Sequence, residues 1–347
     1  MPTIPVGVLG ATGMVGQQFI ALLANHPWFH VEWLGASQRS EGKAYRDAAA
    51  WRLPSPLPDH VAARTVEAAT PGRAPRLVFS GLDSSVAGEI ETAFAAAGHI
   101  IVSNSRNHRM ERTVPLLIPE VNADHLALLD AQGARGWKGR IVTNPNCAVV
   151  VMAMALAPLR QFGLRTTMIT TLQAISGAGY PGVASWDILA NVIPHIGGGE
   201  EEKVETEAKK ILGSLDNGSV TLHAVVVSAT TTRVPVHDGH TGSISVGLEQ
   251  KPTLDAIIHA WRSFKGRPQT LELPSAPPHP IVYLTEANRP QPSLDVHRGG
   301  GMTVSIGRLR ACPVLDYKFI ALGHNTIRGA AGAAILNAEL MHSEGLL

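Results

Sequence analysis

Cys147 is the residue of this chain best placed to act as a nucleophile, in the run Thr143-Asn144-Pro145-Asn146-Cys147. Residues 140–142 predict a buried strand before this run, and residues 148–156 predict a buried helix after it. Proline lacks an N–H and restricts its predecessor, so the strand must end at residues 144–146. The thiol is therefore expected at a helix N-terminus, where unpaired N–H groups and the helix dipole favour a thiolate. An inert packing cysteine is the alternative for this residue taken alone.

A glycine-rich turn follows the first predicted strand, residues 6–9, and an amphipathic helix follows the turn. In that setting, backbone N–H groups can bind the pyrophosphate of a dinucleotide. Because the glycine spacing is G-x-x-G-x-x-G, a tight turn without a ligand is the alternative. The residues of the turn that we expect to contact a cofactor are Gly10, Thr12, Gly13, Met14 and Val15.

The end of the second predicted strand, residues 31–36, indicates which dinucleotide would bind. An NAD enzyme is expected to place an acidic residue there to hold the ribose 2′-hydroxyl. This chain instead has Ser37, Arg39, Ser40 and Lys43, whose hydroxyl and cationic groups suit a 2′-phosphate. The predicted cofactor is therefore NADP, with Ser37, Arg39 and Ser40 among the residues that bind it.

Further strands at residues 77–80 and 99–102, separated by a helix at residues 87–97, continue the alternation of strand and helix. This alternation predicts a mostly parallel, doubly wound sheet whose ligands lie beyond the carboxyl ends of the strands. Asn104 to Arg109 follow one such end. Arg106 and Arg109 there suit a phosphate, unless they are plain solvated charges.

A length of 347 residues is enough for two domains with separate cores. We predict an α/β fold whose first domain is a Rossmann-type doubly wound parallel sheet over residues 1–147. The C-terminal helix, residues 325–347, is expected to rejoin that domain. Residues 148–324 are expected to form an α+β domain.

In the second domain, a strand at residues 166–173 leads into a loop of small residues at 174–182. Backbone N–H groups around Ser176 and Gly177 could hold an anion or a nicotinamide ring, although a mobile loop fits the same composition.

A β-rich region at residues 220–246 is broken near its middle by proline and glycine, which places two histidines at a bend between strands. Asp238 lies between His237 and His240, but no third ligand accompanies them, so we expect no metal. His240 suits an acid/base partner of Cys147, because histidine can titrate near neutral pH.

Overall charge and cysteine usage exclude several classes of function. A formal net charge of +1 offers no electrostatic footprint for nucleic acid or an anionic membrane. Two cysteines exclude a disulfide scaffold and fit a reducing cytoplasm, and we expect Cys312 to be structural. No apolar run approaches the roughly 20 residues of a membrane span. The charges of residues 200–210 predict a solvated helix with pairs such as Glu205–Lys209.

Together these motifs resemble aspartate-semialdehyde dehydrogenase, in the branch typified by archaeal and fungal enzymes. The resemblance runs nearly end to end, through residues 10–16, 103–109, 144–147, 173–179, 200–203, 233–240 and 324–332. It implies a homodimer or homotetramer that is assembled through the catalytic and dimerisation domain at residues 148–324. His237 is a departure, because an apolar residue is expected at that position.

The resemblance also implies roles at the reaction centre. Cys147 matches the nucleophile, His240 the acid/base residue and Gln173 a glutamine that orients the acyl group. Gly177 and Asn325 match residues near the nicotinamide.

Other matched residues imply a substrate site. Arg233 matches an arginine that binds a substrate carboxylate. Glu201, chosen over its neighbour Glu200, matches a residue that binds the substrate amine. Lys203 and Arg109, with Asn104 close by, match the residues that bind phosphate.

The implied reaction is the reduction of L-aspartyl 4-phosphate by NADPH to L-aspartate 4-semialdehyde and phosphate, through a thioester on Cys147. One alternative is a related reductase of another activated acid, of the malonyl-CoA or N-acetylglutamyl-phosphate type. Another is an inert nucleotide-sensing protein on the same fold, in which Cys147 would not react with iodoacetamide. Residues 144–147 with Glu201 and Lys203 favour an acyl phosphate over an acyl-CoA.

Overall fold

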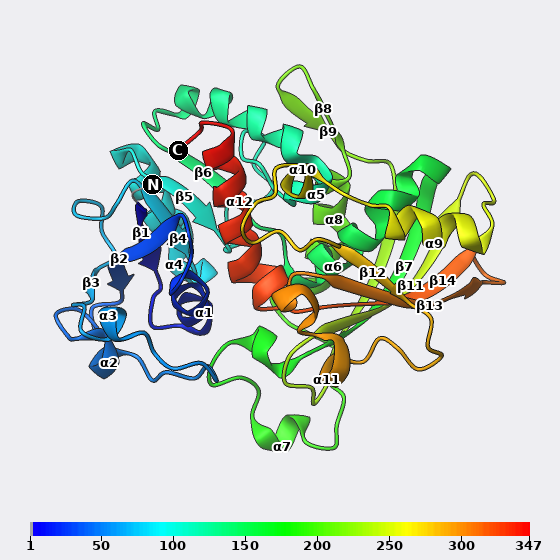
Figure 1. Ribbon diagram of the computed structural model, residues 1–347, viewed down its shortest axis with the longest axis horizontal. Helices are drawn as coiled ribbons and strands as arrows, with labels where there is room; N and C mark the ends of the chain where they lie inside the picture. Colours follow the sequence, from blue (N-terminus) through cyan, green and yellow to red (C-terminus); the bar gives the residue numbers. More distant parts are fainter. Residues whose placement is uncertain (1–2) are drawn as a thin grey trace.

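The computed structural model describes residues 3–347, whose strands form two six-stranded sheets and one two-stranded hairpin (Figure 1). The first sheet has the order β3-β2-β1-β4-β5-β6, and every pairing in it is parallel. Its strands are β1 (Ile4–Leu9), β2 (Phe29–Ala36), β3 (Glu67–Ala68), β4 (Leu77–Ser80), β5 (Ile100–Ser103) and β6 (Arg140–Thr143). The predicted doubly wound parallel sheet is therefore confirmed.

The strands of the first sheet are short apolar runs because helices cover both of its faces. Strands β4 and β5 are buried along their whole length. Local signals set the bounds of the longest helix, α4, since Asp83 caps its N-terminus and Gly98, at φ 110°, ends it. The helical segments of this region are α1 (Met14–Leu23), α2 (Tyr45–Ala48), α3 (Asp59–Ala62), α4 (Ser84–Ala97), α5 (Pro119–Asn122) and η1 (Ala123–Arg135).

The second sheet is mixed and has the order β10-β7-β11-β14-β13-β12. Its two outermost pairs, β10 with β7 and β12 with β13, are parallel, and the inner pairs are antiparallel. The strands are β7 (Leu164–Gln173), β10 (Val226–Arg233), β11 (His240–Leu248), β12 (Ile281–Leu284), β13 (Val304–Ala311) and β14 (Tyr317–Gly323). The separate hairpin pairs β8 (Ser214–Asp216) with β9 (Ser219–Thr221).

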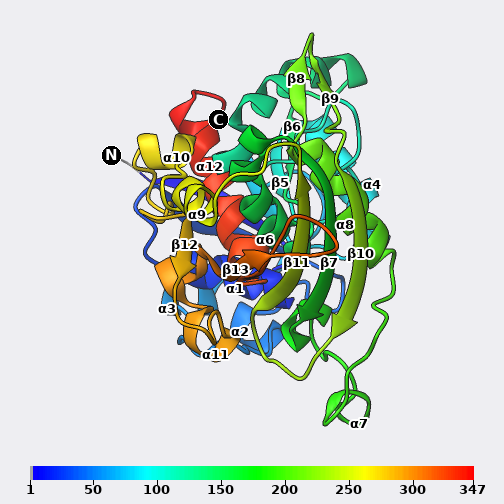
Figure 2. The same cartoon turned by 90° about the vertical axis from the view of Figure 1, so that its right-hand side faces the viewer.

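One face of the second sheet is covered by helices and the other is open. In Figure 2 no helix lies in front of β7, β10 and β11. Strand β7 alternates accordingly: Ile169 is buried, whereas Met168 and Leu172 are exposed. The other helical segments before residue 302 are α6 (Cys147–Leu156), η2 (Ala157–Phe162), η3 (Ile175–Ala178), α7 (Ser185–Ile188), α8 (Glu200–Ile211), α9 (Leu254–Arg262), α10 (Arg267–Thr270), α11 (Pro292–Asp295) and η4 (Arg298–Gly301).

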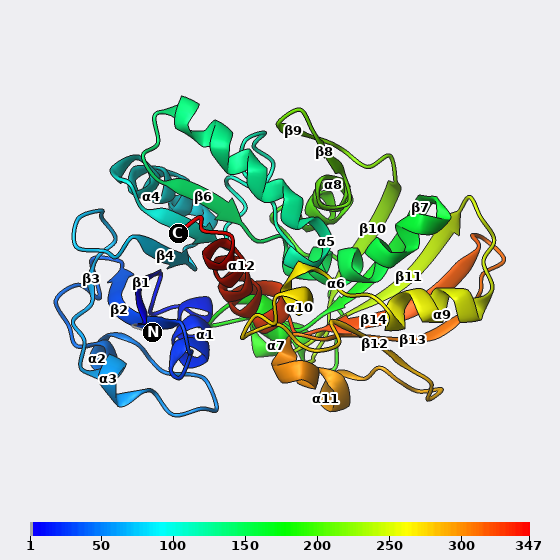
Figure 3. The ribbon, with the colours of Figure 1, turned by 45° about the horizontal axis from the view of Figure 1, so that its top comes forward.

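Two helices connect the sheets. Helix α6 is apolar on all sides and packs into the core beneath the second sheet. Helix α12 (Gly332–Ser343) follows the π-helical turn η5 (Ile327–Ala331) and packs into the core of the first sheet. Figure 3 shows α12 running between the two sheets. The domain limits expected at residues 147 and 325 stay a prediction.

No helix in residues 3–347 combines the length and apolar character that spanning a membrane requires.

Helix α8 differs from the prediction that it is solvated. Glu200, Glu207 and Lys210 are buried, because one face of the helix packs against α6 and β10. No ion pair joins Glu205 to Lys209 within residues 3–347; Glu205 instead accepts the N–H of Ala229. A pattern of charges along a helix does not reveal which of its faces is covered.

A buried ion pair ties η5 to α5 and thereby holds the segment beside Cys147. The Arg328 guanidinium donates to both oxygens of Glu120, at 2.8 and 2.7 Å, and both side chains are 0% exposed. The next residue, Gly329, lies against Cys147. The pair therefore fixes one wall of the space around the thiol.

We expect Glu120→Ala to lower the free energy of unfolding by about 3–5 kcal/mol, because it leaves a buried guanidinium without its partner. Urea denaturation measures the change. Glu344→Ala is the matched control: its ion pair with Arg267 is solvent-exposed, so its loss should cost less than about 1 kcal/mol. Equal losses in the two variants would contradict the importance of the buried pair.

Candidate active site

A cavity of about 970 Å³ lies beyond the carboxyl ends of the first sheet and reaches the second sheet. It brings together most of the site residues expected from the sequence. Those expected at the cofactor are Gly10, Thr12, Gly13, Met14, Val15, Ser37, Arg39, Ser176, Gly177 and Asn325. Those expected at the substrate or the reaction centre are Asn104, Arg109, Cys147, Gln173, Lys203 and Arg233.

Glycines let the backbone of the turn before α1 pack closely against the first turn of that helix. Gly10 has φ +71°, and a Cβ on Gly16 would lie 2.3 Å from the Gly10 carbonyl oxygen. No side chain caps α1 at Gly13, so the first N–H groups of the helix are free to bind an anion. The turn lines the same cavity as Cys147, which fits a dinucleotide extending from its pyrophosphate toward the thiol.

Ser37 and Arg39 are exposed at the end of β2 and line the cavity. Ser40 differs from the expectation. It does not line the cavity and is 9% exposed, and its N–H donates to the Ser37 carbonyl in a turn.

Cys147 is the first residue of α6, as the sequence predicts. The Asn146 side chain caps the helix by accepting the N–H groups of Ala148, at 2.8 Å, and Val149, at 3.3 Å. Burial, followed by the nearby Glu200 carboxylate, raises the pKa of the Cys147 thiol to about 12 against the pull of Arg109, Arg233 and Lys203. The neutral thiol is therefore the resting form, which corrects the expectation of a resting thiolate. Low-dielectric surroundings outweigh the helix terminus.

His240 is the first residue of β11 and is 1% exposed. Burial and the Arg233 charge lower its pKa to about 3, so the ring is neutral. Its Nδ1 accepts the Ala174 N–H at 3.1 Å, which places the single ring proton on Nε2. Nε2 has no hydrogen-bond partner within residues 3–347.

Gly177 lies against the side chains of both His240 and Arg233. A Cβ at this glycine would come within 2.9 Å of Arg233 Nη1 and of His240 Cε1. The backbone fixes the Arg233 guanidinium, because its Nη1 donates to the Ala174 carbonyl at 2.7 Å. Asn325 ties the same loop to the His240 turn, since it donates to Ser176 Oγ and accepts the Gly239 N–H, each at 2.8 Å.

Glu200 is the carboxylate that enters the site. It is 7% exposed, and its Oε1 accepts Asn146 Nδ2 at 2.8 Å and Gln173 Nε2 at 3.2 Å. Lys203 Nζ donates to its Oε2 at 2.6 Å. Burial acts to raise the Glu200 pKa, but Lys203 and these hydrogen bonds outweigh it, so the pKa lies below its ordinary value.

Glu201, the residue preferred from the sequence, does not line the cavity. Its carboxylate accepts the N–H of Thr231, on β10. Successive helical residues point about 100° apart, so of two adjacent glutamates only one can face the site.

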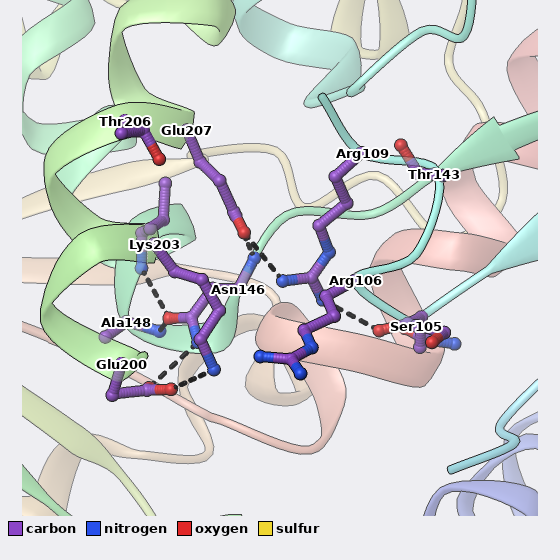
Figure 4. A network of polar contacts seen from close by, with 12 residues as sticks. Ser105, Arg106, Arg109, Thr143, Asn146, Ala148, Glu200, Lys203, Thr206 and Glu207 are labelled. Carbon is purple, nitrogen blue, oxygen red and sulfur yellow. Dashed lines mark hydrogen bonds and ion pairs between the residues drawn. The ribbon is translucent and has the colours of Figure 1, made fainter. Parts of the chain in front are cut away.

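Arg109 also lines the cavity and is 7% exposed. Its Nη1 donates to Glu207 at 2.9 Å, and its Nη2 donates to the Asn104 carbonyl at 2.7 Å (Figure 4). Arg106 lines the cavity nearby and donates to the Gly198 carbonyl.

Four polar residues that build the site are not among those expected from the sequence: Asn146, Glu200, Glu207 and Lys210. Three of them belong, with Lys203, to one stripe of α8 at spacings of three, four and three residues. That spacing marks one face of a helix and was available in the sequence. Asn146 could have been found as a helix cap directly before the cysteine.

No group of three or more His, Cys, Asp or Glu side chains in residues 3–347 is arranged to hold a metal ion. Asp238 is hydrogen-bonded to the exposed His237, at 2.7 Å. Cys312 contacts Ser245, on the second sheet.

The arrangement suits acyl transfer to Cys147. The thiol shares its cavity with cations that can bind an anionic leaving group and with a glycine turn that can bind a dinucleotide. His240 does not itself line the cavity; its imidazole, with a free N–H, lies directly behind Gly177, which does.

Comparisons with known proteins agree with this chemistry. Residues 5–129 match the family model described as "Semialdehyde dehydrogenase, NAD binding domain", and residues 156–328 match "Semialdehyde dehydrogenase, dimerisation domain". The chain is 48% identical to an aspartate-semialdehyde dehydrogenase of Cryptococcus neoformans, over 100% of this chain and 99% of the relative. It is 46% identical to one of Archaeoglobus fulgidus, over 99% of each chain.

A solved structure extends the agreement to three dimensions. The crystal structure of aspartate semialdehyde dehydrogenase with NADP from Candida albicans superposes with a TM-score of 0.91, at 41% identity and over 100% of both chains. Sequence, fold and site thus agree over the full length, and the chain belongs to the aspartate-semialdehyde dehydrogenase family.

Proposed function

We propose that the protein catalyses the NADPH-dependent reduction of L-aspartyl 4-phosphate to L-aspartate 4-semialdehyde, with release of phosphate. The single observation that carries the proposal is the cavity in which the glycine turn, Cys147 and the cations Arg109 and Lys203 meet. The names of the similar fungal and archaeal enzymes support the substrate, and the Candida albicans structure, which was solved with NADP, supports the cofactor.

Different polar groups of the cavity would bind different parts of this substrate. Arg233 would bind the α-carboxylate, because a guanidinium can form two parallel hydrogen bonds to it. Glu200 would bind the α-amine, since its lowered pKa keeps it ionised. Arg109 and Lys203 would bind the phosphate.

The first half-reaction moves the acyl group onto the protein. The Cys147 sulfur attacks the acyl carbon, the bond from that carbon to the phosphate oxygen breaks, and the thiol proton leaves with the phosphate. Arg109 and Lys203 stabilise the charge that develops on the departing phosphate. Gln173, which is 1% exposed and donates to Glu200, would orient the acyl group. The product is a thioester on Cys147.

The second half-reaction releases the aldehyde. When bound, NADPH supplies a hydride to the acyl carbon. The His240 Nε2–H would donate a hydrogen bond to the carbonyl oxygen and stabilise the negative charge that develops there. The carbon–sulfur bond then breaks as the carbonyl re-forms, and the departing sulfur takes up one proton from solvent.

The decisive assay runs the reaction in reverse, with L-aspartate 4-semialdehyde, NADP+ and inorganic phosphate. Formation of NADPH that requires phosphate supports the proposal. Formation that requires coenzyme A instead would indicate a reductase of the malonyl-CoA type. No turnover with either, together with a Cys147 that resists iodoacetamide, would indicate the nucleotide sensor.

We propose a homodimer or homotetramer built on the open face of the second sheet. Met168, Leu172 and Val226 are exposed apolar side chains on the edge strand β10 and its neighbour β7, and the match to a dimerisation domain covers both strands. A cytoplasmic location fits two cysteines that are both free.

We expect Cys147→Ser to bind NADPH normally but to lose at least about a thousandfold in turnover, because an unactivated hydroxyl is a far weaker nucleophile. Fluorescence titration and the reverse assay measure the two effects. Cys312→Ser is the matched control and should keep wild-type turnover. Substantial turnover by Cys147→Ser would rule out the covalent route.

For Arg39→Ala we expect the preference for NADPH over NADH, measured as the ratio of kcat/KM values, to fall about tenfold or more as a charge-assisted phosphate contact is lost. Arg46→Ala removes a nearby exposed arginine that does not line the cavity, and should leave the ratio unchanged. An unaltered ratio in both variants would place the 2′-phosphate elsewhere.

The raised pKa of Cys147 predicts how its alkylation depends on pH. In the free enzyme, well below a thiol pKa of about 12, the thiolate fraction grows about tenfold with each pH unit. The rate of carbamidomethylation by iodoacetamide, followed by mass spectrometry of the Cys147 peptide, should therefore rise from about pH 7 to about pH 9 without a plateau. A plateau below about pH 8 would show that the thiolate is the resting form.

A further inference from the structure

Glu207 is a buried carboxylate that binds two parts of the site at once. Its Oε1 accepts Arg109 Nη1 at 2.9 Å, and its Oε2 accepts the backbone N–H of Asn146 at 2.7 Å. The side chain is 2% exposed and does not line the cavity. Figure 4 shows it pointing from α8 into the space between Arg109 and Asn146.

The two groups that Glu207 joins lie far apart in sequence and have different chemical tasks. Arg109 is a cation of the proposed phosphate site, whereas Asn146 directly precedes the nucleophile and caps its helix. Apart from Glu207, the Arg109 guanidinium donates within residues 3–347 only to the Asn104 carbonyl, and its buried Nε has no partner. Without Glu207, a single hydrogen bond would orient the guanidinium.

One helical turn further along α8, Lys210 fixes the backbone that carries Arg109. Its buried ammonium donates to the carbonyls of Arg109, Glu111 and Val114, at 2.7, 2.7 and 2.8 Å. Lys210 therefore holds the loop, while Glu207 holds the side chain that projects from it. The guanidinium itself is oriented by Glu207 and by the Asn104 carbonyl.

We propose that Glu207 is a positioning residue of the phosphate site, which fixes the Arg109 guanidinium relative to the Cys147 turn. The inference rests on the proposed function, in which phosphate leaves beside Arg109 as the Cys147 sulfur attacks. Both groups must reach the same substrate, so the distance between them decides whether the acyl carbon and the phosphate are engaged together. A carboxylate with one oxygen on each group sets that distance.

Glu207→Gln tests the proposal with almost no change in volume. The amide keeps one acceptor oxygen, so its NH2 must face either Arg109 or the Asn146 N–H, and two donors then meet. We expect the KM for phosphate in the reverse reaction to rise about tenfold or more, while the KM for NADP+ changes by less than about twofold. A residue that only stabilised the fold would not shift one constant selectively.

Two further variants make the comparison specific. Glu202→Gln is the matched control, because it makes the same chemical change on an exposed residue of the same helix, and it should behave as wild type. Glu207→Asp keeps both oxygens and the charge, so it should recover part of the loss in phosphate KM. Thermal melting and NADP+ binding check that each variant is folded.

A double-mutant cycle shows whether Glu207 acts through Arg109. In an Arg109→Ala background, the further change Glu207→Gln should alter phosphate binding by less than about twofold, because the group it positions is gone. Binding of inorganic phosphate to the full chain with NADP+ present, followed by calorimetry, supplies this readout without turnover. Fully additive losses would overturn the positioning role.

The outcomes separate this inference from the proposed function. Normal wild-type turnover with unchanged or tighter phosphate binding in Glu207→Gln refutes the positioning role alone. A wild type that binds phosphate but forms no NADPH refutes the proposed function, and the calorimetric comparison still decides on Glu207. A wild type that binds no phosphate refutes both.

Discussion

The position of the nucleophile depends on the hydrogen bonds of one turn residue, Asn146. Its side-chain oxygen accepts two N–H groups of α6, its amide nitrogen donates to Glu200, and its backbone N–H donates to Glu207. All these partners are buried, so each bond that failed to form would leave a polar atom without water. Because the turn joins the last strand of the first sheet to the helix beneath the second, the thiol lies where the two sheets meet.

Burial and charge act against each other around this thiol. Burial keeps Cys147 protonated and His240 neutral at rest, so neither group carries a charge before a substrate enters. Three cations, Arg109, Lys203 and Arg233, surround them with only two carboxylates, Glu200 and Glu207. The resting site therefore holds a surplus of positive charge, which favours the binding of an anionic substrate.

The parts of the fold that could be predicted are those with a strong local cause. Buried parallel strands are continuous apolar runs, so β4, β5 and β6 were found close to their observed bounds. Proline in the turn before Cys147 and glycine in the turn before α1 mark where strands end. The burial of one face of α8 could not be predicted, because its charges alone do not show that the turn residue Asn146 and the loop that carries Arg109 cover that face.

The sequence by itself determined the parallel sheet, the glycine turn and the placement of Cys147 at a helix start, because each depends on residues close together in the chain. Tertiary structure decided that Glu200 rather than Glu201 faces the cavity, that Ser40 is buried outside the cavity lining and that Glu207 joins Arg109 to Asn146. It also decided the protonation of the thiol, since a pKa depends on burial and on charges brought from distant segments. Such contacts leave no local pattern, because the partners meet only when the two sheets and α8 have packed together.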